Sequence, residues 1–427
     1  MIYSCKSIKE VFKLITIEHE NPYTLLELLL KLLADYEEMK GLIEDFDGEI
    51  DRRVLEEFRK LLEDGTIEEM IGEEVVANLL SEILEVNEKV EDIKDTIGNV
   101  KDYGAVGDGI TDDTGAIYNA IKNHSRIYLP KGRYLIQKLY VSTSCVIEGD
   151  TCPYAWREQP NTGSVLVVKH DETDPDIGGI INIGWNDGGN SLVFKNITFE
   201  GEQGTGTGVW ARWDCTFDQC LFRNLTAGIR DYHASRIHDC QFENCTYGIY
   251  GLTDIMVSTC TFSRCGTGIY GYSNNGNYNL INNCRIEYCS AYGINLQSCV
   301  YNSIIGCQFD KNDLGLQLEN ATEVCVVGCH FDRNVRYHSE FKGTSGANFT
   351  GCQFIKRSTS DGSGGEVKPE KGINLISYSN SVVVGCSANG KLFSVDNYQY
   401  KGGELLVDGT ITPYFEDYET SGTPEDL

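Results

Sequence analysis

The 427-residue sequence has little proline, little positive charge and no long hydrophobic run. Only 8 residues are proline, so no proline-rich linker divides the chain. The 36 lysines and arginines face 64 aspartates and glutamates, and the net charge of −28 argues against nucleic acid or an anionic membrane as a partner. No run of about 18 apolar residues occurs, which predicts no membrane insertion. The first residues also lack the pattern of a signal peptide, so we expect assembly in a cytoplasm.

Cysteine, by contrast, is abundant. There are 17 cysteines, an odd number in a long chain, and none of them forms a tight cluster of the Cys-x-x-Cys type that binds zinc. The sequence therefore predicts reduced, buried thiols, with neither a metal site nor a cofactor.

The first hundred residues have a helical pattern. Residues 1–66 are strongly acidic and carry no catalytic motif, and we interpret them as a helical region that attaches the chain to a larger particle. Within residues 67–100, apolar residues alternate at steps of three and four from Val76 to Val100. Most of them are β-branched at both core positions of the heptad, which favours a coiled coil of three or more helices over one of two. We therefore predict a short trimeric coiled coil, although one amphipathic helix packed on a core would show a related pattern.

An internal repeat dominates the chain after residue 100. A Cys-x-Phe or Cys-x-Ile triplet recurs at intervals of 20 to 24 residues, and a Gly-Ile pair or its equivalent follows most of the triplets. Such a unit is too short for a strand–helix–strand motif and fits one coil of a stacked β-solenoid. The cysteines of the triplets should form one inward column: Cys220, Cys240, Cys260, Cys284, Cys307, Cys329 and Cys352. A second column is expected at a turn: Cys245, Cys265, Cys289, Asn312 and Asn334.

The start of this region carries a family signal. The sequence from Asp102 to Thr114, the alanines and isoleucines at 116–121, and the segment from Ile127 to Ile136 resemble the opening of the pectate-lyase-like right-handed β-helix superfamily. Phage tail spikes, and the collar appendages of short-tailed phages of Gram-positive bacteria, are the members that it resembles in particular. The motif has a structural explanation: glycines for a tight turn, Thr111 as a helix cap, and Asp112 and Asp113 in the first turn of a helix that caps the solenoid. We therefore do not expect Asp108, Asp112 or Asp113 to be catalytic.

The resemblance implies an architecture and a setting. The predicted fold is an all-β right-handed parallel β-helix over residues 101–400, preceded by the α-helical region and the coiled coil and followed by a polar tail at 401–427. It also implies a homotrimer in a virion tail or collar, held to other virion proteins through the N-terminal region. The expected ligand is a bacterial surface polysaccharide.

A candidate site follows from aligning the coils that start at Gly208, Gly228 and Gly248. The alignment predicts an outer face rich in aromatic, cationic and acidic side chains, which suits sugar rings and their hydroxyls. The candidate catalytic residues are Asp214, Asp231 and Asp254. The candidate substrate-binding residues are Trp210, Arg212, Trp213, Arg230, Tyr232, His233, Arg236, Tyr250, Tyr270 and Tyr272. An ordinary exposed face or a contact between subunits would present the same residues.

Two further points bear on the chemistry. A second outward strip, of Arg223, Glu243, Ser263, Glu287, Asp310 and Asp332, could hold an acid pair such as Glu243 with Glu287, but its lack of aromatic residues favours a solvated face. Motifs of polygalacturonase-type hydrolases are absent from the repeats, and Asp231 with Arg230 and Arg236 only faintly matches a lyase. We therefore expect a glycoside hydrolase rather than a lyase, with a non-catalytic adhesin or a structural appendage of the same fold as the alternatives.

Overall fold

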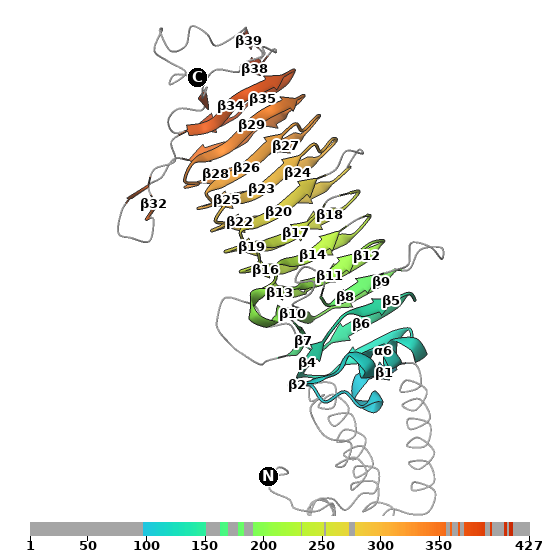
Figure 1. Cartoon of the computed structure of the whole chain (residues 1–427). Helices are drawn as coiled ribbons and strands as arrows, with labels where there is room; N and C mark the ends of the chain where they lie inside the picture. Colours follow the sequence, from blue (N-terminus) through green and yellow to red (C-terminus); the bar gives the residue numbers. More distant parts are fainter. Residues whose placement is uncertain are drawn as a thin grey trace, which may run out of the picture. The chain divides into compact units, whose positions relative to one another are not determined.

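A computed structural model describes the solenoid. It covers residues 97–150, 163–169, 178–182, 191–231, 233–251, 253–272 and 278–355, and then 359–360, 366–367, 371–388, 393–394, 405–407 and 410–412. The predicted attachment region at 1–66, and the predicted coiled coil at 67–100 except its last four residues, lie outside the described residues. The described coils stack into a shaft with three long parallel sheets along its sides (Figure 1).

The first sheet, called sheet A, begins where the described residues begin. Its strands pair in parallel from coil to coil, except for an antiparallel pair at its end. They are β1 (Ile97–Asn99), β3 (Arg126–Leu129), β6 (Cys145–Gly149), β9 (Leu192–Lys195), β12 (Cys215–Asp218), β15 (Arg236–His238), β18 (Met256–Ser258), β21 (Leu280–Asn282), β24 (Ser303–Ile305), β27 (Cys325–Val327), β30 (Asn348–Thr350), β35 (Ser381–Val384), β38 (Leu405–Val407) and β39 (Thr410–Thr412).

Sheet B carries the Cys-x-Phe triplets. Each triplet buries both its cysteine and its phenylalanine or isoleucine inside the coil, because residues two apart along a strand point to the same face. The strands are β2 (Asp108–Asp112), β4 (Gly132–Ile136), β7 (Ser164–Val168), β10 (Ile197–Gly201), β13 (Leu221–Arg223), β16 (Gln241–Glu243), β19 (Thr261–Ser263), β22 (Arg285–Glu287), β25 (Gln308–Asp310), β28 (His330–Asp332), β31 (Gln353–Ile355) and β36 (Ser387–Ala388).

Sheet C carries the Gly-Ile pairs. The glycines cannot be replaced without a clash: a Cβ on Gly228 would lie 2.7 Å from the carbonyl oxygen of Gly248 in the next coil. The strands are β5 (Leu139–Val141), β8 (Ile180–Asn182), β11 (Thr207–Ala211), β14 (Ala227–Asp231), β17 (Tyr247–Tyr250), β20 (Thr267–Tyr272), β23 (Tyr292–Gln297), β26 (Leu314–Glu319), β29 (Tyr337–Ser345), β34 (Lys371–Ser379) and β37 (Phe393–Ser394). A separate two-stranded hairpin joins β32 (Thr359–Ser360) to β33 (Glu366–Val367).

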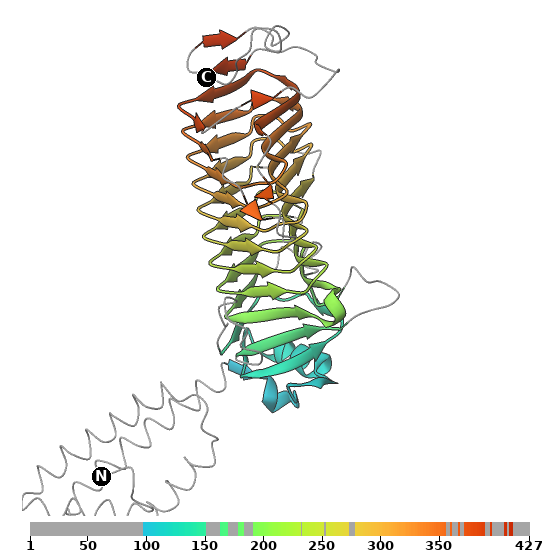
Figure 2. The ribbon, with the colours of Figure 1, turned by 90° about the vertical axis from the view of Figure 1, so that its left-hand side faces the viewer.

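The core confirms both predicted columns. All seven cysteines of the inward column are free thiols with at most 1% of their surface exposed. Beside them the phenylalanine rings stack coil on coil, with centroids 4.9 Å apart for Phe222 and Phe242 and 4.6 Å for Phe242 and Phe262. Figure 2 shows the ribbon of the coils stacked along the shaft. At the bend, the Asn312 carboxamide accepts the backbone N–H of Cys289 at 2.9 Å, and Asn334 does the same for Asn312 at 3.0 Å. Polar ladders thus satisfy the backbone of the bends.

The capping helix is present, but it starts later than predicted. Helix α6 (Thr114–Asn123) buries Ile117, Ala120 and Ile121 and packs on β1, β3 and β5 at one end of the shaft. Its cap is Asp113 rather than Thr111, because Thr111 still belongs to β2 and bonds to the Asp108 carboxylate. Two short 3-10 helices, η2 (Val100–Tyr103) and η4 (Glu202–Gly204), complete the described elements. No helix among the described residues has the length and apolarity to cross a membrane.

The aspartates of the opening motif are structural, but the predicted placement of Asp112 and Asp113 in the first turn of the helix is wrong, because Asp112 ends β2 and Asp113 precedes α6. The Asp113 carboxylate is buried and accepts the backbone N–H groups of Val106 and Gly107 at 2.6 and 3.0 Å. Asp108 accepts the N–H groups of Thr111 and Ile110, and these bonds lower the pKa of its carboxyl group. Asp108, Asp112 and Asp113 thus stabilise the turn and the start of α6 through hydrogen bonds to backbone N–H groups.

One boundary of the predicted coiled coil is wrong. Ile97 lies in β1, which pairs with β3, and Val100 is fully buried at the start of η2. β-Branched residues suit a strand as well as a heptad core. The apolar spacing alone therefore does not show where the predicted coiled coil ends.

Candidate functional site

The predicted outer face exists on sheet C. The register of β11, β14, β17 and β20 places Trp210 beside Arg230, Arg230 beside Tyr250, and Tyr250 beside Tyr270. We call these four residues the aromatic–arginine column. It arises because each of them follows the inward Val or Ile of its coil by one residue and therefore points out.

The members of the column contact one another closely. The Arg230 guanidinium lies 5.5 Å from the centroid of Trp210 and 5.0 Å from that of Tyr250, and Arg212 covers Trp210 at 4.3 Å. The rings of Tyr250 and Tyr270 stack with centroids 5.2 Å apart. Burial raises the pKa of Tyr270 to about 12, so its hydroxyl stays protonated at neutral pH and donates to Gln297 at 2.8 Å. The result is a column along the shaft in which each side chain stacks on that of the next coil.

A second group of predicted residues gathers at the bend after sheet C. Asp214 pairs with the guanidinium of Arg236 at 2.7 Å. His233 lies edge-on to Trp213, with centroids 4.6 Å apart, and its Nδ1 is 3.5 Å from a carboxylate oxygen of Asp254. Both aspartates have positive φ values, +24° and +54°, and occupy the same bend two coils apart. The bend thus presents two partly exposed carboxylates, each beside a cation or an imidazole.

Asp231 does not lie on the outer face, so its predicted placement is wrong. It pairs with Ala211 in the sheet register, is 3% exposed, and accepts the hydroxyl of Ser235. Alternation along β14 explains this: Ile229 points in, Arg230 points out and Asp231 points in again. The period-2 pattern could have identified it from sequence. Of the other predicted residues, Tyr272 is exposed at the end of β20, and Tyr232 lies outside the described residues.

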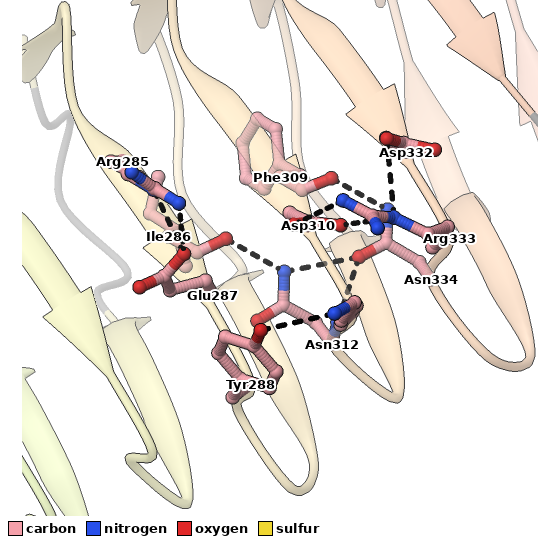
Figure 3. A network of polar contacts seen from close by, with 11 residues as sticks. Arg285, Ile286, Glu287, Tyr288, Phe309, Asp310, Asn312, Asp332, Arg333 and Asn334 are labelled. Atoms are coloured by element: carbon pink, nitrogen blue, oxygen red, sulfur yellow. Dashed lines mark hydrogen bonds and ion pairs between the residues drawn. The ribbon is translucent and has the colours of Figure 1, made fainter. Parts of the chain in front are cut away.

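The second predicted strip forms a column on sheet B, with Glu243, Ser263 and Glu287 in register on successive strands. It is not simply a solvated face, because arginines pair with its acids (Figure 3). Arg333 bonds to Asp310 at 2.8 Å and lies 3.2 Å from Asp332, while Arg285 bonds to Glu287 at 2.8 Å. A hollow of about 150 Å³ opens within this strip, between Glu243 and Glu287. The sequence gives no sign of it, since neither burial nor cavities can be read from a repeat.

One group in the described part of the chain could offer three ligands to a metal ion. Asp218, His238 and Asp239 place ligand atoms within 4.8 Å of one another. His238 already lies 3.2 Å from Asp218, and Asp239 is exposed, so an ordinary surface pair accounts for the arrangement.

Comparison with known proteins agrees with this architecture. The family "Right handed beta helix region" matches residues 236–388, and "Rhamnogalacturonase A/epimerase, pectate lyase-like" matches residues 97–178. Among solved structures, the A-module of mannuronan C-5 epimerase AlgE4 from Azotobacter vinelandii has a TM-score of 0.50 at 14% identity, over 72% of this chain and 96% of that one. Tailspike protein 3 of bacteriophage CBA120 also has a TM-score of 0.50, at 15% identity, over 77% of this chain and 64% of that one. These likenesses show the fold.

The three parallel sheets and the two matching families define a right-handed β-helix. Two separate parts of the chain thus match families of right-handed and pectate-lyase-like β-helices, in agreement with the fold. Among curated relatives, the pre-neck appendage protein of Bacillus phage B103 is 31% identical over 127 residues, which are 26% of this chain and 14% of that protein. Mannuronan C5-epimerase AlgE5 of Azotobacter vinelandii is 27% identical over 128 residues, 27% of this chain and 12% of that protein. The chain thus spans about a seventh or less of these relatives.

Proposed function

We propose that this chain is the shaft subunit of a trimeric phage tail or collar appendage that binds a bacterial surface polysaccharide through sheet C. The observation that carries the proposal is the aromatic–arginine column. Because the rings stack on one another along the column, they offer a ligand their edges and hydroxyls, and the guanidinium groups donate to sugar hydroxyls and carboxylates. Coils repeat about every 4.8 Å, so the column offers successive contacts to an extended polymer rather than one deep pocket for a small molecule.

The phage setting is supported by the relatives. The opening of the β-helix is the part with a phage motif, and a pre-neck appendage protein and a phage tailspike are among the similar proteins. The net charge of −28 agrees with a partner other than nucleic acid. Attachment to other virion proteins is assigned to residues 1–66.

Trimer formation is supported by two features, the predicted coiled coil and the outer face of sheet A. From β18 to β35 this face carries no charged residue among the described positions, although 23% of the chain is charged. Depletion of charge is typical of the core of a protein interface. We therefore assign this face to contacts between copies. The outward residues are Met256, Ser258, Leu280, Asn282, Ser303, Ile305, Cys325, Val327, Asn348, Thr350, Val382 and Val384.

Cleavage of the bound polymer is the finer part of the proposal. Asp214 and Asp254 lie two coils apart, or about 9.6 Å between backbones at roughly 4.8 Å per coil. Inverting glycosidases hold their two carboxyl groups about 6.5–9.5 Å apart. In this scheme one aspartate donates a proton to the leaving oxygen and the other activates water.

A non-catalytic adhesin is the second candidate. The ion pair between Asp214 and Arg236 favours it, since the Asp214 carboxylate is already bonded to a partner within the chain.

The deciding experiment is incubation of the full chain with surface polysaccharides from candidate host bacteria. New reducing ends alone would indicate a hydrolase. Reducing ends together with the absorbance of unsaturated uronates would indicate a lyase and direct attention to Arg230 and Arg236. Binding to one polymer without products would establish the adhesin, and the absence of binding to any polymer would refute the proposed function.

A further inference from the structure

The hollow on sheet B has the features of a built binding site. Its floor is Thr261 and Ser263 on β19, two short side chains between longer ones. Gln241 and Glu243 on β16 line one side, and Glu287 and Tyr288 line the other. The register of the three strands therefore creates the hollow by placing small residues in the middle coil.

Glu287 is the group in this hollow that lacks a full set of partners. Its side chain is 1% exposed. One carboxylate oxygen accepts the Nε–H of Arg285 at 2.8 Å. The other oxygen is buried and has no hydrogen-bond donor within the described part of the chain. A buried carboxylate oxygen without a hydrogen-bond donor is unfavourable, because burial has removed the water molecules that would otherwise donate to it.

The remaining lining groups define the chemistry of that donor. Glu243 is paired with Arg264 at 2.8 Å, and Glu287 with Arg285. Each acid in the hollow is therefore neutralised by an arginine, so the lining favours neither an anionic nor a cationic ligand. Tyr288 is 44% exposed and lines the hollow, and its hydroxyl accepts a hydrogen bond from Lys311 at 3.0 Å. An uncharged group with hydroxyl donors and an apolar face matches this lining.

We propose that this hollow binds one uncharged sugar residue. A sugar hydroxyl donates to the free oxygen of Glu287, further hydroxyls bond to Glu243 and Ser263, and a face of the ring packs against Tyr288. The site lies on a different sheet from the aromatic–arginine column, so it is a second point of attachment. The inference rests on the proposed function, in that a chain that binds polysaccharide has a use for a second sugar site.

The test uses the full chain and a panel of neutral monosaccharides at millimolar concentration, including glucose, galactose and N-acetylglucosamine, observed by saturation-transfer NMR. Ser263→Met fills the hollow without removing a polar partner of any other group. Glu287→Gln replaces the acceptor at constant shape. Gln353→Met, at an exposed position of the same sheet, is the matched control. Tyr250→Ala removes one member of the aromatic–arginine column on sheet C.

The expected result, measured with Tyr250→Ala present throughout so that the column on sheet C contributes little, is saturation transfer to at least one sugar. It is weakened tenfold or more in affinity by Ser263→Met and Glu287→Gln, and unchanged by Gln353→Met. Undiminished transfer in Ser263→Met would overturn the proposal, as would no transfer to any sugar in the unmodified chain. Failure of the proposed function would be seen separately. In that case the full chain would bind no polymer, whether or not saturation transfer to a monosaccharide is observed.

Discussion

The guanidinium of Arg230 lies 5.0 Å from the ring centroid of Tyr250, one coil farther along sheet C. The contact holds both side chains in a stack along the shaft. Tyr250→Ala should therefore weaken polysaccharide binding by about 1–2 kcal/mol, or roughly five- to thirtyfold in Kd, by removing a ring edge and a hydroxyl from the column and releasing Arg230. Titration calorimetry with the bound polymer measures this. Tyr118→Ala, on the exposed side of α6, should leave Kd unchanged, and equal affinities for all three proteins would refute the column as the binding face.

Asp214→Asn and Asp254→Asn should each reduce product formation at least a hundredfold if the chain is a glycosidase, because each removes a proton-transfer group. Binding of the polymer should remain, so the loss would appear in kcat. Asp313→Asn removes an acid that is likewise paired with an arginine, Arg336, elsewhere on the shaft, and should retain full activity. If both single variants cleave at the original rate, the active site lies elsewhere.

Introducing charge on sheet A should weaken the proposed trimer. Analytical ultracentrifugation of the unmodified chain should give three times the 47.6 kDa subunit mass. Met256→Glu combined with Ile305→Glu buries like charges and should shift the equilibrium toward monomers at low concentration. Gln353→Glu, on sheet B, is the control. A monomeric mass for the unmodified chain would refute the trimer, and an unaffected trimer in the double variant would refute the choice of sheet A.

Asn312→Leu should destabilise the shaft by about 1–3 kcal/mol, because the buried N–H of Cys289 loses its acceptor while the shape of the side chain is kept. The midpoint of urea unfolding reports the loss. Gln308→Leu, at an exposed position of β25, should unfold at nearly the original midpoint. A midpoint for Asn312→Leu that matches the unmodified chain would show that the ladder of the bends adds no stability.

The stability of the shaft should depend on pH through Glu200. Burial raises the pKa of this carboxyl, but the hydrogen bond from Arg133 and the ion pair with Arg223 outweigh it, and the pKa falls below the ordinary 4.5. A lowered folded-state pKa means that the stabilisation is complete above about pH 4.5 and is lost as the pH falls through the folded value.

Glu200→Gln should accordingly be about 1–3 kcal/mol less stable than the unmodified chain at pH 7, and the difference should shrink toward pH 3. Denaturant unfolding across this pH range measures it. Glu148→Gln, which loses only an exposed pair with Arg126, is the control. A difference that stays constant down to pH 3 would mean that the charge of Glu200 is not what stabilises the coil.

The repeat made most of the fold predictable. The columns of Cys220 to Cys352 and of Trp210 to Tyr270 follow from aligning coils, because strands that pair in register bring equivalent residues together. The opening motif predicted the capping helix, apart from its first turn. The end of the heptad pattern could not be located, because Ile97 and Val100 satisfy a strand and a buried core equally well.

Sequence by itself determined which residues share a column, since a solenoid turns periodicity directly into adjacency. Tertiary structure decided what each column can do. It paired the acids of sheet B with arginines and left one oxygen of Glu287 buried beside a hollow. These outcomes depend on side-chain orientation, on neighbours from other coils and on the exclusion of water, and none of these is encoded in the spacing of a repeat.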